Sequence, residues 1–138
     1  MQLAELGQNG KIITVEIREK FIKKFHPSVE YLTGSSTDLK IIQKIKDKIT
    51  EEDIVMVILD SDHDEEHVYD ELVKYHSFVS KNNYLIVEDT FWIHDNSRTG
   101  PKDAVHRFLK DYPDLFEIDK SREKFLITYN PDGFLLKK

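Results

Sequence analysis

The stretch Asp53-Ile-Val-Met-Val-Ile-Leu59, followed by Asp60-Ser-Asp-His63, decides the fold class. An unbroken apolar run of this length is typical of a central parallel strand that is covered on both faces. A second run, Tyr84-Leu-Ile-Val87, leads into Glu88-Asp89 and predicts another buried strand. Between the two runs, apolar residues recur at helical spacing, which predicts a helix packed on the sheet. These residues are Val68, Leu72, Tyr75 and Val79.

The same alternation extends toward the N-terminus. The β-branched segment Lys11–Ile17 and the short segment Val29–Leu32 predict two earlier strands. A helix is expected after Gly34, capped by Ser36 or Thr37, because isoleucines follow at helical spacing. Strands that alternate with helices predict an α/β fold with a mostly parallel sheet, right-handed crossovers and helices on both faces.

The C-terminal part follows a different pattern. Pro101 begins a predicted helix. The segments Leu115–Ile118 and Phe125–Tyr129 are joined by too few residues for a crossover, so we expect an antiparallel hairpin. Asn130–Gly133 then predicts a turn into Phe134–Leu136, a candidate edge strand.

Composition narrows the class of protein. The chain has 138 residues, of which 39% are hydrophobic and 33% charged, as expected of one globular domain over residues 1–138. A net charge of -6 argues against binding to nucleic acid, which depends on clustered Lys and Arg. There is no cysteine, and no apolar run long enough to span a membrane or act as a signal peptide. A cytoplasmic location is therefore the default expectation.

Candidate functional residues follow the predicted strands, because ligands bind beyond the carboxyl ends of parallel strands. The four strand ends carry Glu16, Gly34-Ser35-Ser36, Asp60–His63 and Glu88-Asp89. Asp60 and the Glu88-Asp89 pair should end neighbouring strands and converge. Such oxygen ligands suit Mg²⁺, Mn²⁺ or Ca²⁺. The alternative is that these acids cap helices or face water.

Two histidines and a loop add further candidates. His63 and His67 have a spacing that can hold zinc with a third ligand, although a solvated or capping role is the simpler interpretation of His67. His63, beside the acids, is a candidate general base. Phe91, Trp92 and His94 lie in a predicted loop over the sheet edge, where they either cover a substrate or pack.

Several of these segments together resemble one enzyme family. Val57-Ile-Leu-Asp-Ser-Asp-His63, Tyr84-Leu-Ile-Val-Glu-Asp-Thr90 and Lys124-Phe-Leu-Ile-Thr-Tyr-Asn-Pro-Asp-Gly133 are similar to the cephalosporin hydroxylase group of S-adenosylmethionine-dependent methyltransferases. That group includes rhamnosyl O-methyltransferases. The likeness runs from about Gly10 to the C-terminus, and it also includes Gly34-Ser-Ser-Thr-Asp38.

The resemblance implies a three-layer Rossmann-like sheet with a C-terminal antiparallel strand, and it implies roles for the site residues. Asp60, Glu88 and Asp89 would match a site for Mg²⁺ or another divalent cation, with Asp62 as a substitute ligand. Glu16 would face the ribose of S-adenosylmethionine, with Asp60 also on the cofactor side, and Ser35 and Ser36 would lie near the adenine. The metal would lower the pKa of a substrate hydroxyl, whose oxygen then attacks the sulfonium methyl.

One departure from the family pattern shapes the expectation. Family members begin with a strand and a glycine-rich turn, whereas this chain begins at Met1-Gln-Leu-Ala-Glu-Leu6 and contains no G-x-G-x-x-G. We therefore expect an N-terminally truncated sheet. An unfilled central position would expose unpaired backbone groups, which predicts rearrangement or association into a homo-oligomer.

The leading hypothesis is a metal-assisted O-methyltransferase for a sugar or another small hydroxylated substrate, as in glycolipid biosynthesis. The absent glycine-rich loop keeps a second hypothesis open, a non-catalytic methyltransferase-like binding subunit. A third is a metal-dependent hydrolase that uses the acids and His63.

Overall fold

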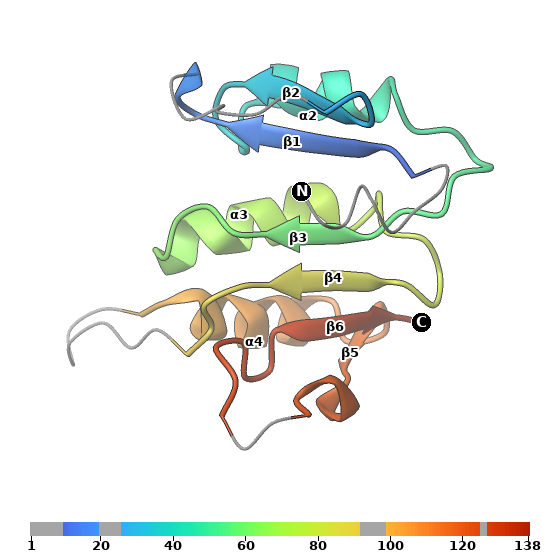
Figure 1. Ribbon diagram of the computed structural model, residues 1–138. Helices are drawn as coiled ribbons and strands as arrows, with labels where there is room; N and C mark the ends of the chain where they lie inside the picture. Colours follow the sequence, from blue (N-terminus) through green and yellow to red (C-terminus); the bar gives the residue numbers. More distant parts are fainter. Residues whose placement is uncertain (1–9, 20–25, 92–98, 125–126) are drawn as a thin grey trace. The chain divides into compact units, whose positions relative to one another are not determined.

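The computed structural model describes residues 10–19, 26–91, 99–124 and 127–138. It divides into two compact units, residues 1–48 and residues 49–138. The described part is an α/β structure with two sheets and three α-helices (Figure 1). A single, mostly parallel sheet is not confirmed.

The first unit contains a parallel pair of strands and one helix. Strand β1 (Ile12–Glu16) pairs with β2 (Val29–Thr33), and Glu16 lies opposite Thr33. Helix α2 (Leu39–Lys46) begins after Asp38, whose Oδ1 accepts a hydrogen bond from the Lys40 N–H at 2.7 Å. The predicted caps Ser36 and Thr37 are therefore wrong. The Thr37 hydroxyl instead bonds the Ser35 hydroxyl at 3.0 Å in the preceding loop.

The second unit contains a four-stranded sheet and two α-helices. The strand order is β3 (Val57–Leu59), β4 (Tyr84–Val87), β6 (Phe134–Lys137) and β5 (Phe116–Ile118). Strands β3 and β4 are parallel, as predicted, whereas β6 is antiparallel to both of its neighbours.

Helices α3 (Glu65–Tyr75) and α4 (Pro101–Asp111) pack against each other and lie on the same side of this sheet (Figure 1). Apolar residues at helical spacing point from both helices toward the strands, which explains why the side chains of Leu72 and Phe108 are fully buried. The rings of Phe108 and Phe116 join α4 to β5, with centroids 5.8 Å apart. This layer is the core of the second unit.

Strand β3 is shorter than the apolar run predicts. Residues 53–56 are not part of the sheet, because the Val55 backbone bonds Ser80 instead of a neighbouring strand. The Val55 N–H donates to Ser80 Oγ at 2.9 Å, and the Val55 carbonyl accepts from the Ser80 N–H at 3.0 Å. Within the described sheet β3 occupies an edge, so its predicted central position is wrong for this unit.

The C-terminal strands run antiparallel, but the predicted hairpin partner is wrong where the structure describes it. Residues 127–129 form no strand, and Phe125 and Leu126 lie outside the described residues. Strand β5 instead pairs with β6, which is an interior strand and not an edge. The chain between them contains a short 3-10 helix, η2 (Lys120–Arg122). Apolar Phe134–Leu136 therefore occupies the interior position beside β4, where Leu135 is fully buried.

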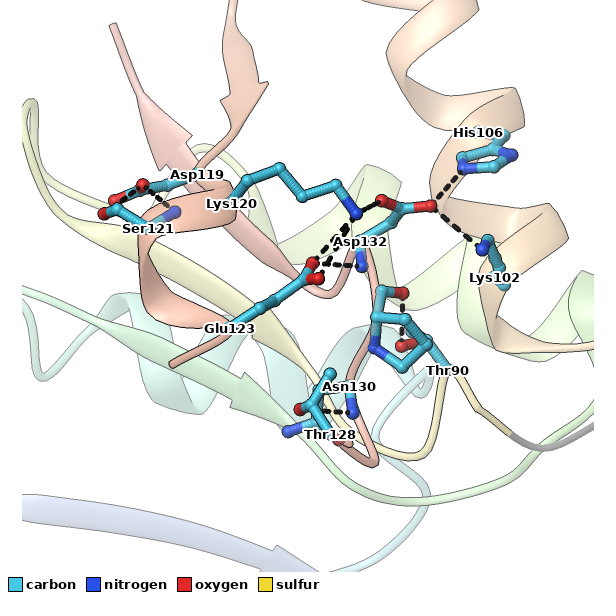
Figure 2. A network of polar contacts seen from close by, with 11 residues as sticks. Thr90, Lys102, His106, Asp119, Lys120, Ser121, Glu123, Thr128, Asn130 and Asp132 are labelled. Atoms are coloured by element: carbon cyan, nitrogen blue, oxygen red, sulfur yellow. Dashed lines mark hydrogen bonds and ion pairs between the residues drawn. The ribbon is translucent and has the colours of Figure 1, made fainter. Parts of the chain in front are cut away.

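The turn before β6 is held by a polar network (Figure 2). Asp132 accepts from Lys102 and His106 of α4, both at 3.1 Å, and from Lys120 of η2. The Asp132 N–H donates to Glu123 Oε1 at 2.8 Å. Burial alone would raise the pKa of Asp132, but the bonds from Lys120, Lys102 and His106 outweigh it and hold this pKa well below its usual range.

No helix in the described part of the chain is long and apolar enough to cross a membrane.

Replacing Gly133 by alanine should destabilise the second unit. A Cβ atom at this position would lie 2.3 Å from the Val87 carbonyl oxygen, and neither backbone can move without breaking the β4–β6 pairing. We expect the free energy of unfolding in urea to fall by about 2 kcal/mol, as for other overpacked sites. Ser77→Ala, at an exposed position, is the control and should change it by less than about 0.5 kcal/mol. Equal stability of Gly133→Ala and wild type would contradict the packing described above.

Replacing Asp132 by asparagine should reduce stability in a pH-dependent way. Because the pKa of Asp132 is lowered in the folded state, its contribution is fully present above the unfolded value of about 3.9. That contribution is lost as the pH falls through the folded pKa. We expect the difference in unfolding free energy between wild type and Asp132→Asn to be largest near pH 7 and to shrink below about pH 4. Asp114→Asn, at an exposed position, is the control, and a difference that stays constant with pH would refute the network.

Candidate functional site

The carboxyl ends of β3 and β4 bring together two of the predicted acidic segments. Parallel pairing places Leu59 opposite Val87, and the Glu88 N–H donates to the Leu59 carbonyl at 2.9 Å. Asp60 and Glu88 therefore follow neighbouring strands at the edge of the sheet that the carboxyl ends of β3 and β4 form, as the sequence predicts. This edge is the candidate site of the second unit.

Asn130 fixes both acids that follow β4. Its Nδ2 donates to Glu88 Oε2 at 2.8 Å, and its Oδ1 accepts from the Asp89 N–H at 2.9 Å. Asp89 has a φ of 54°, in the left-handed region, which few residues other than glycine, asparagine and aspartate adopt. The buried amide of Asn130 restrains Asp89 in this conformation.

The turn that carries Asn130 is anchored in the fold on both sides. The Asn130 N–H donates to the Thr128 hydroxyl at 3.1 Å, and the Thr90 hydroxyl donates to the Pro131 carbonyl at 2.7 Å (Figure 2). In the sequence, residues 130–133 indicate a turn and belong to a segment that carries the family resemblance, but no role for the Asn130 side chain is predicted. The signal that could have identified Asn130 is its side chain, because an amide both donates and accepts and can therefore join a carboxylate to a backbone N–H.

His63, the predicted base, contacts Asp89, one of the predicted acids at this edge. His63 Nε2 lies 3.0 Å from Asp89 Oδ2, and both side chains are 37% exposed. A carboxylate in this position orients the imidazole ring. The pair can therefore accept and hold a proton at the surface of the site.

Glu71 is a buried acid that sequence analysis missed. Its residue is 1% exposed, and its Oε1 accepts from the Ser61 hydroxyl at 2.8 Å and lies 3.6 Å from His67 Nε2. Its Oε2 has no hydrogen-bond partner in the described part of the chain. Glu71 directly precedes buried Leu72 and ties the loop after β3 to α3. Burial, together with the charge of Glu71, raises the pKa of Tyr75 on the same helix.

The predicted metal ligands do not assemble into a metal-holding group. Asp60 and Asp62 are exposed, and Asp62 Oδ1 accepts from the Asp64 N–H at 3.0 Å. Glu88 is bonded to Asn130 and Asp89 to His63, as described above. Over residues 10–19, 26–91, 99–124 and 127–138, no group of three or more His, Asp or Glu side chains is placed to hold a cation. This finding covers both the divalent site and the zinc spacing of His63 and His67.

The first unit gathers the residues predicted to face a nucleoside. The Gly34 N–H donates to the Glu16 carbonyl at 3.1 Å, which places Glu16 and the Gly34–Ser36 loop at the same carboxyl edge. Glu16 Oε1 accepts from the Arg18 N–H at 3.0 Å, and the Ser35 hydroxyl bonds that of Thr37. The carboxylate can accept hydrogen bonds from ribose hydroxyls, and the hydroxyls of the neighbouring loop can form hydrogen bonds with a base.

Of the three loop residues predicted to cover a substrate or pack, the structure describes one. Phe91 is 54% exposed, whereas Trp92 and His94 lie outside the described residues.

Comparison with known proteins gives a consistent result. Residues 1–138 match the family described as rhamnosyl O-methyltransferase/CmcI. A rhamnosyl O-methyltransferase of Mycobacterium tuberculosis (strain ATCC 25618 / H37Rv) is 31% identical over 98% of this chain and 59% of its own length. One from Mycobacterium leprae (strain TN) is 28% identical over 99% of this chain and 63% of its own length.

The chain thus spans about three fifths of the length of these curated relatives, 59% and 63%. No solved structure matches it significantly. The family match covers every described element of both units. The chain therefore belongs to the rhamnosyl O-methyltransferase/CmcI family.

Proposed function

We propose that the protein containing this chain is an S-adenosylmethionine-dependent O-methyltransferase that methylates a hydroxyl of a sugar-containing small molecule. The observation that carries the proposal is the family match over residues 1–138. Relatives that bear the name rhamnosyl O-methyltransferase align with nearly the whole chain, which supports a sugar as the acceptor.

The cofactor supplies an electrophilic methyl group on a sulfonium sulfur. On the protein side, we assign Glu16 to the ribose hydroxyls and Ser35 and Ser36 to the adenine. The support for this assignment is their common position at the carboxyl edge of β1 and β2.

His63 is the proposed general base. Its Nε2 lies 3.0 Å from Asp89 Oδ2, so the carboxylate orients the imidazole ring. The imidazole would take the proton of the acceptor hydroxyl, and the bound cofactor would supply the methyl group to that oxygen. The carboxylate of Asp89 stabilises the imidazolium that results. One proton and one methyl group move, and no oxidant or reductant is needed.

Asn130 and Glu88 position other groups of the site and take no part in proton transfer. The amide of Asn130 holds Asp89 in its left-handed conformation, and so it holds the partner of His63. Glu88, bonded to the same amide, keeps an acceptor oxygen at the edge where a sugar hydroxyl would bind.

A separate proposal is that Asp60, Asp62, Glu88 and Asp89 bind a divalent cation. It rests on the placement of Asp60 and Glu88 after neighbouring parallel strands. These residues form no metal-holding group in the described part of the chain, so no step of the proposed methyl transfer is assigned to a cation. Calorimetric titration with Mg²⁺ tests the proposal: binding that is lost in Glu88→Gln would support it, and an absence of binding would remove it.

Replacing His63 by glutamine should slow methyl transfer strongly. A general base contributes about 100- to 10,000-fold to a rate, so we expect at least a roughly 100-fold lower kcat with methyl-labelled cofactor and methyl α-L-rhamnopyranoside. Affinity for the cofactor should not change. The matched control is His106→Gln, because His106 also contacts a carboxylate, Asp132, at 3.1 Å but belongs to the turn network. It should keep its rate within about twofold. An unchanged rate in His63→Gln would remove this residue as the base.

Replacing Glu16 by glutamine should weaken binding of S-adenosylmethionine. A hydrogen bond to a charged group contributes about 1.5 to 3 kcal/mol, so we expect Kd to rise by about tenfold or more. The measurement is calorimetry with the purified chain. Glu30→Gln is the control, because Glu30 lies near the other end of β2 and pairs with Lys11 and Lys48. If wild type does not bind the cofactor, the proposal fails for this chain. Binding without methyl transfer to any sugar would identify a non-catalytic binding protein instead.

A further inference from the structure

Two aromatic rings stand exposed beside the candidate site of the second unit. Phe91 is 54% exposed and Tyr129 is 70% exposed. Their ring centroids are 6.0 Å apart and their planes meet at 77°, so the two rings form a corner. Nearby Ile127 is 79% exposed. Large apolar side chains that remain exposed together on a folded domain mark binding surfaces more often than isolated ones do.

The two aromatic residues of this corner belong to the same two chain segments as Asp89 and Asn130 of the site. The Phe91 N–H donates to the Tyr129 carbonyl at 2.9 Å, so the backbone fixes the spacing of the rings. Phe91 comes two residues after Asp89, the partner of His63. Tyr129 directly precedes Asn130, which bonds Glu88 and Asp89. The backbone that carries the rings therefore continues directly into the segments that carry Asp89 and Asn130.

This combination matches the chemistry of a sugar ring. A pyranose presents apolar C–H bonds on its faces and hydroxyls at its rim. The C–H face is attracted to the electron-rich face of an aromatic ring, and the hydroxyls need polar partners. A deoxysugar, which has a methyl group in place of one hydroxyl, adds further apolar surface.

The size of the corner argues against a protein partner. An aromatic side chain offers about 150 to 250 Å², so the two partly exposed rings and Ile127 provide on the order of 300 Å². A stable protein interface needs about 800 Å² on each partner. The corner is large enough for one or two sugar rings, and by itself it supplies less than half of the area that a stable protein interface buries on one partner.

We propose that Phe91 and Tyr129 form the acceptor-sugar subsite, in which the apolar face of a deoxysugar ring stacks against the corner while its hydroxyls reach the His63–Asp89 pair. This assignment rests on the proposed function and specifies its substrate contact. Phe91 and Tyr129 determine affinity and specificity for the acceptor, and they take no part in proton transfer.

The test combines equilibrium binding with steady-state kinetics, using methyl α-L-rhamnopyranoside as the probe. Phe91→Leu and Tyr129→Leu keep an apolar side chain but remove the aromatic face. We expect each variant to raise the Kd of the probe and its KM by about three- to tenfold, with kcat and cofactor affinity unchanged. Tyr129→Phe keeps the ring and should retain the wild-type KM. Ile54→Ala is the matched control, because Ile54 is 82% exposed in the same unit but precedes β3, away from its carboxyl end.

The outcomes separate this subsite from the proposed function. Probe binding that weakens in both leucine variants supports the subsite even if no methyl group is transferred, a result that would refute the methyltransferase activity alone. Wild-type values of Kd and KM in both leucine variants would overturn the subsite and leave the activity standing. A wild-type chain that does not bind the probe would also overturn it. So would a dimer, seen by sedimentation, that dissociates when Phe91 is replaced by leucine.

Discussion

The two hydrogen bonds of the Asn130 side chain are the interaction on which the candidate site depends. One amide donates to Glu88 at 2.8 Å and accepts from the Asp89 backbone at 2.9 Å. Because the amide is buried, leaving either partner unsatisfied would cost about 1 to 3 kcal/mol. The left-handed Asp89 therefore persists, and with it the position of the carboxylate that holds His63. A turn near the C-terminus thus shapes the end of β4.

The rest of the second unit secures that turn. Lys102 and His106 reach Asp132 from α4, and Lys120 reaches it from η2. The close approach of Gly133 to the Val87 carbonyl leaves no room for a side chain. On the opposite side of the site, buried Glu71 bonds Ser61 and ties the loop that carries His63 to α3. Charged and polar groups fix the loops, while the apolar layer of α3, α4 and the strands supplies the stability that lets them persist.

Part of the site could be predicted because it depends on strand ends. Glu16, Asp60 and Glu88 follow apolar runs, and within each sheet parallel pairing brings the residues after such runs to one edge. The pairing of His63 with Asp89 follows from the same rule. The roles of Asn130 and Glu71 could not be predicted, because each depends on a contact between segments far apart in the sequence. The arrangement of the four predicted acids as metal ligands was inferred from family likeness, and the described residues do not assemble it.

The sequence by itself determined the types of most described elements and the parallel pairing of β3 with β4, since apolar runs and helical spacing depend on local composition. It also determined the family, through motifs that remain recognisable over the whole chain. Tertiary structure decided the strand order β3-β4-β6-β5, in which β6 is interior. It also decided that the bonds between Ser80 and Val55 keep the residues before Val57 out of the sheet. The exposure of Phe91 and Tyr129 was likewise decided by tertiary structure. The physical reason is that hydrogen bonds and burial between distant segments select among pairings that are locally equivalent, and a sequence pattern contains no information on that choice.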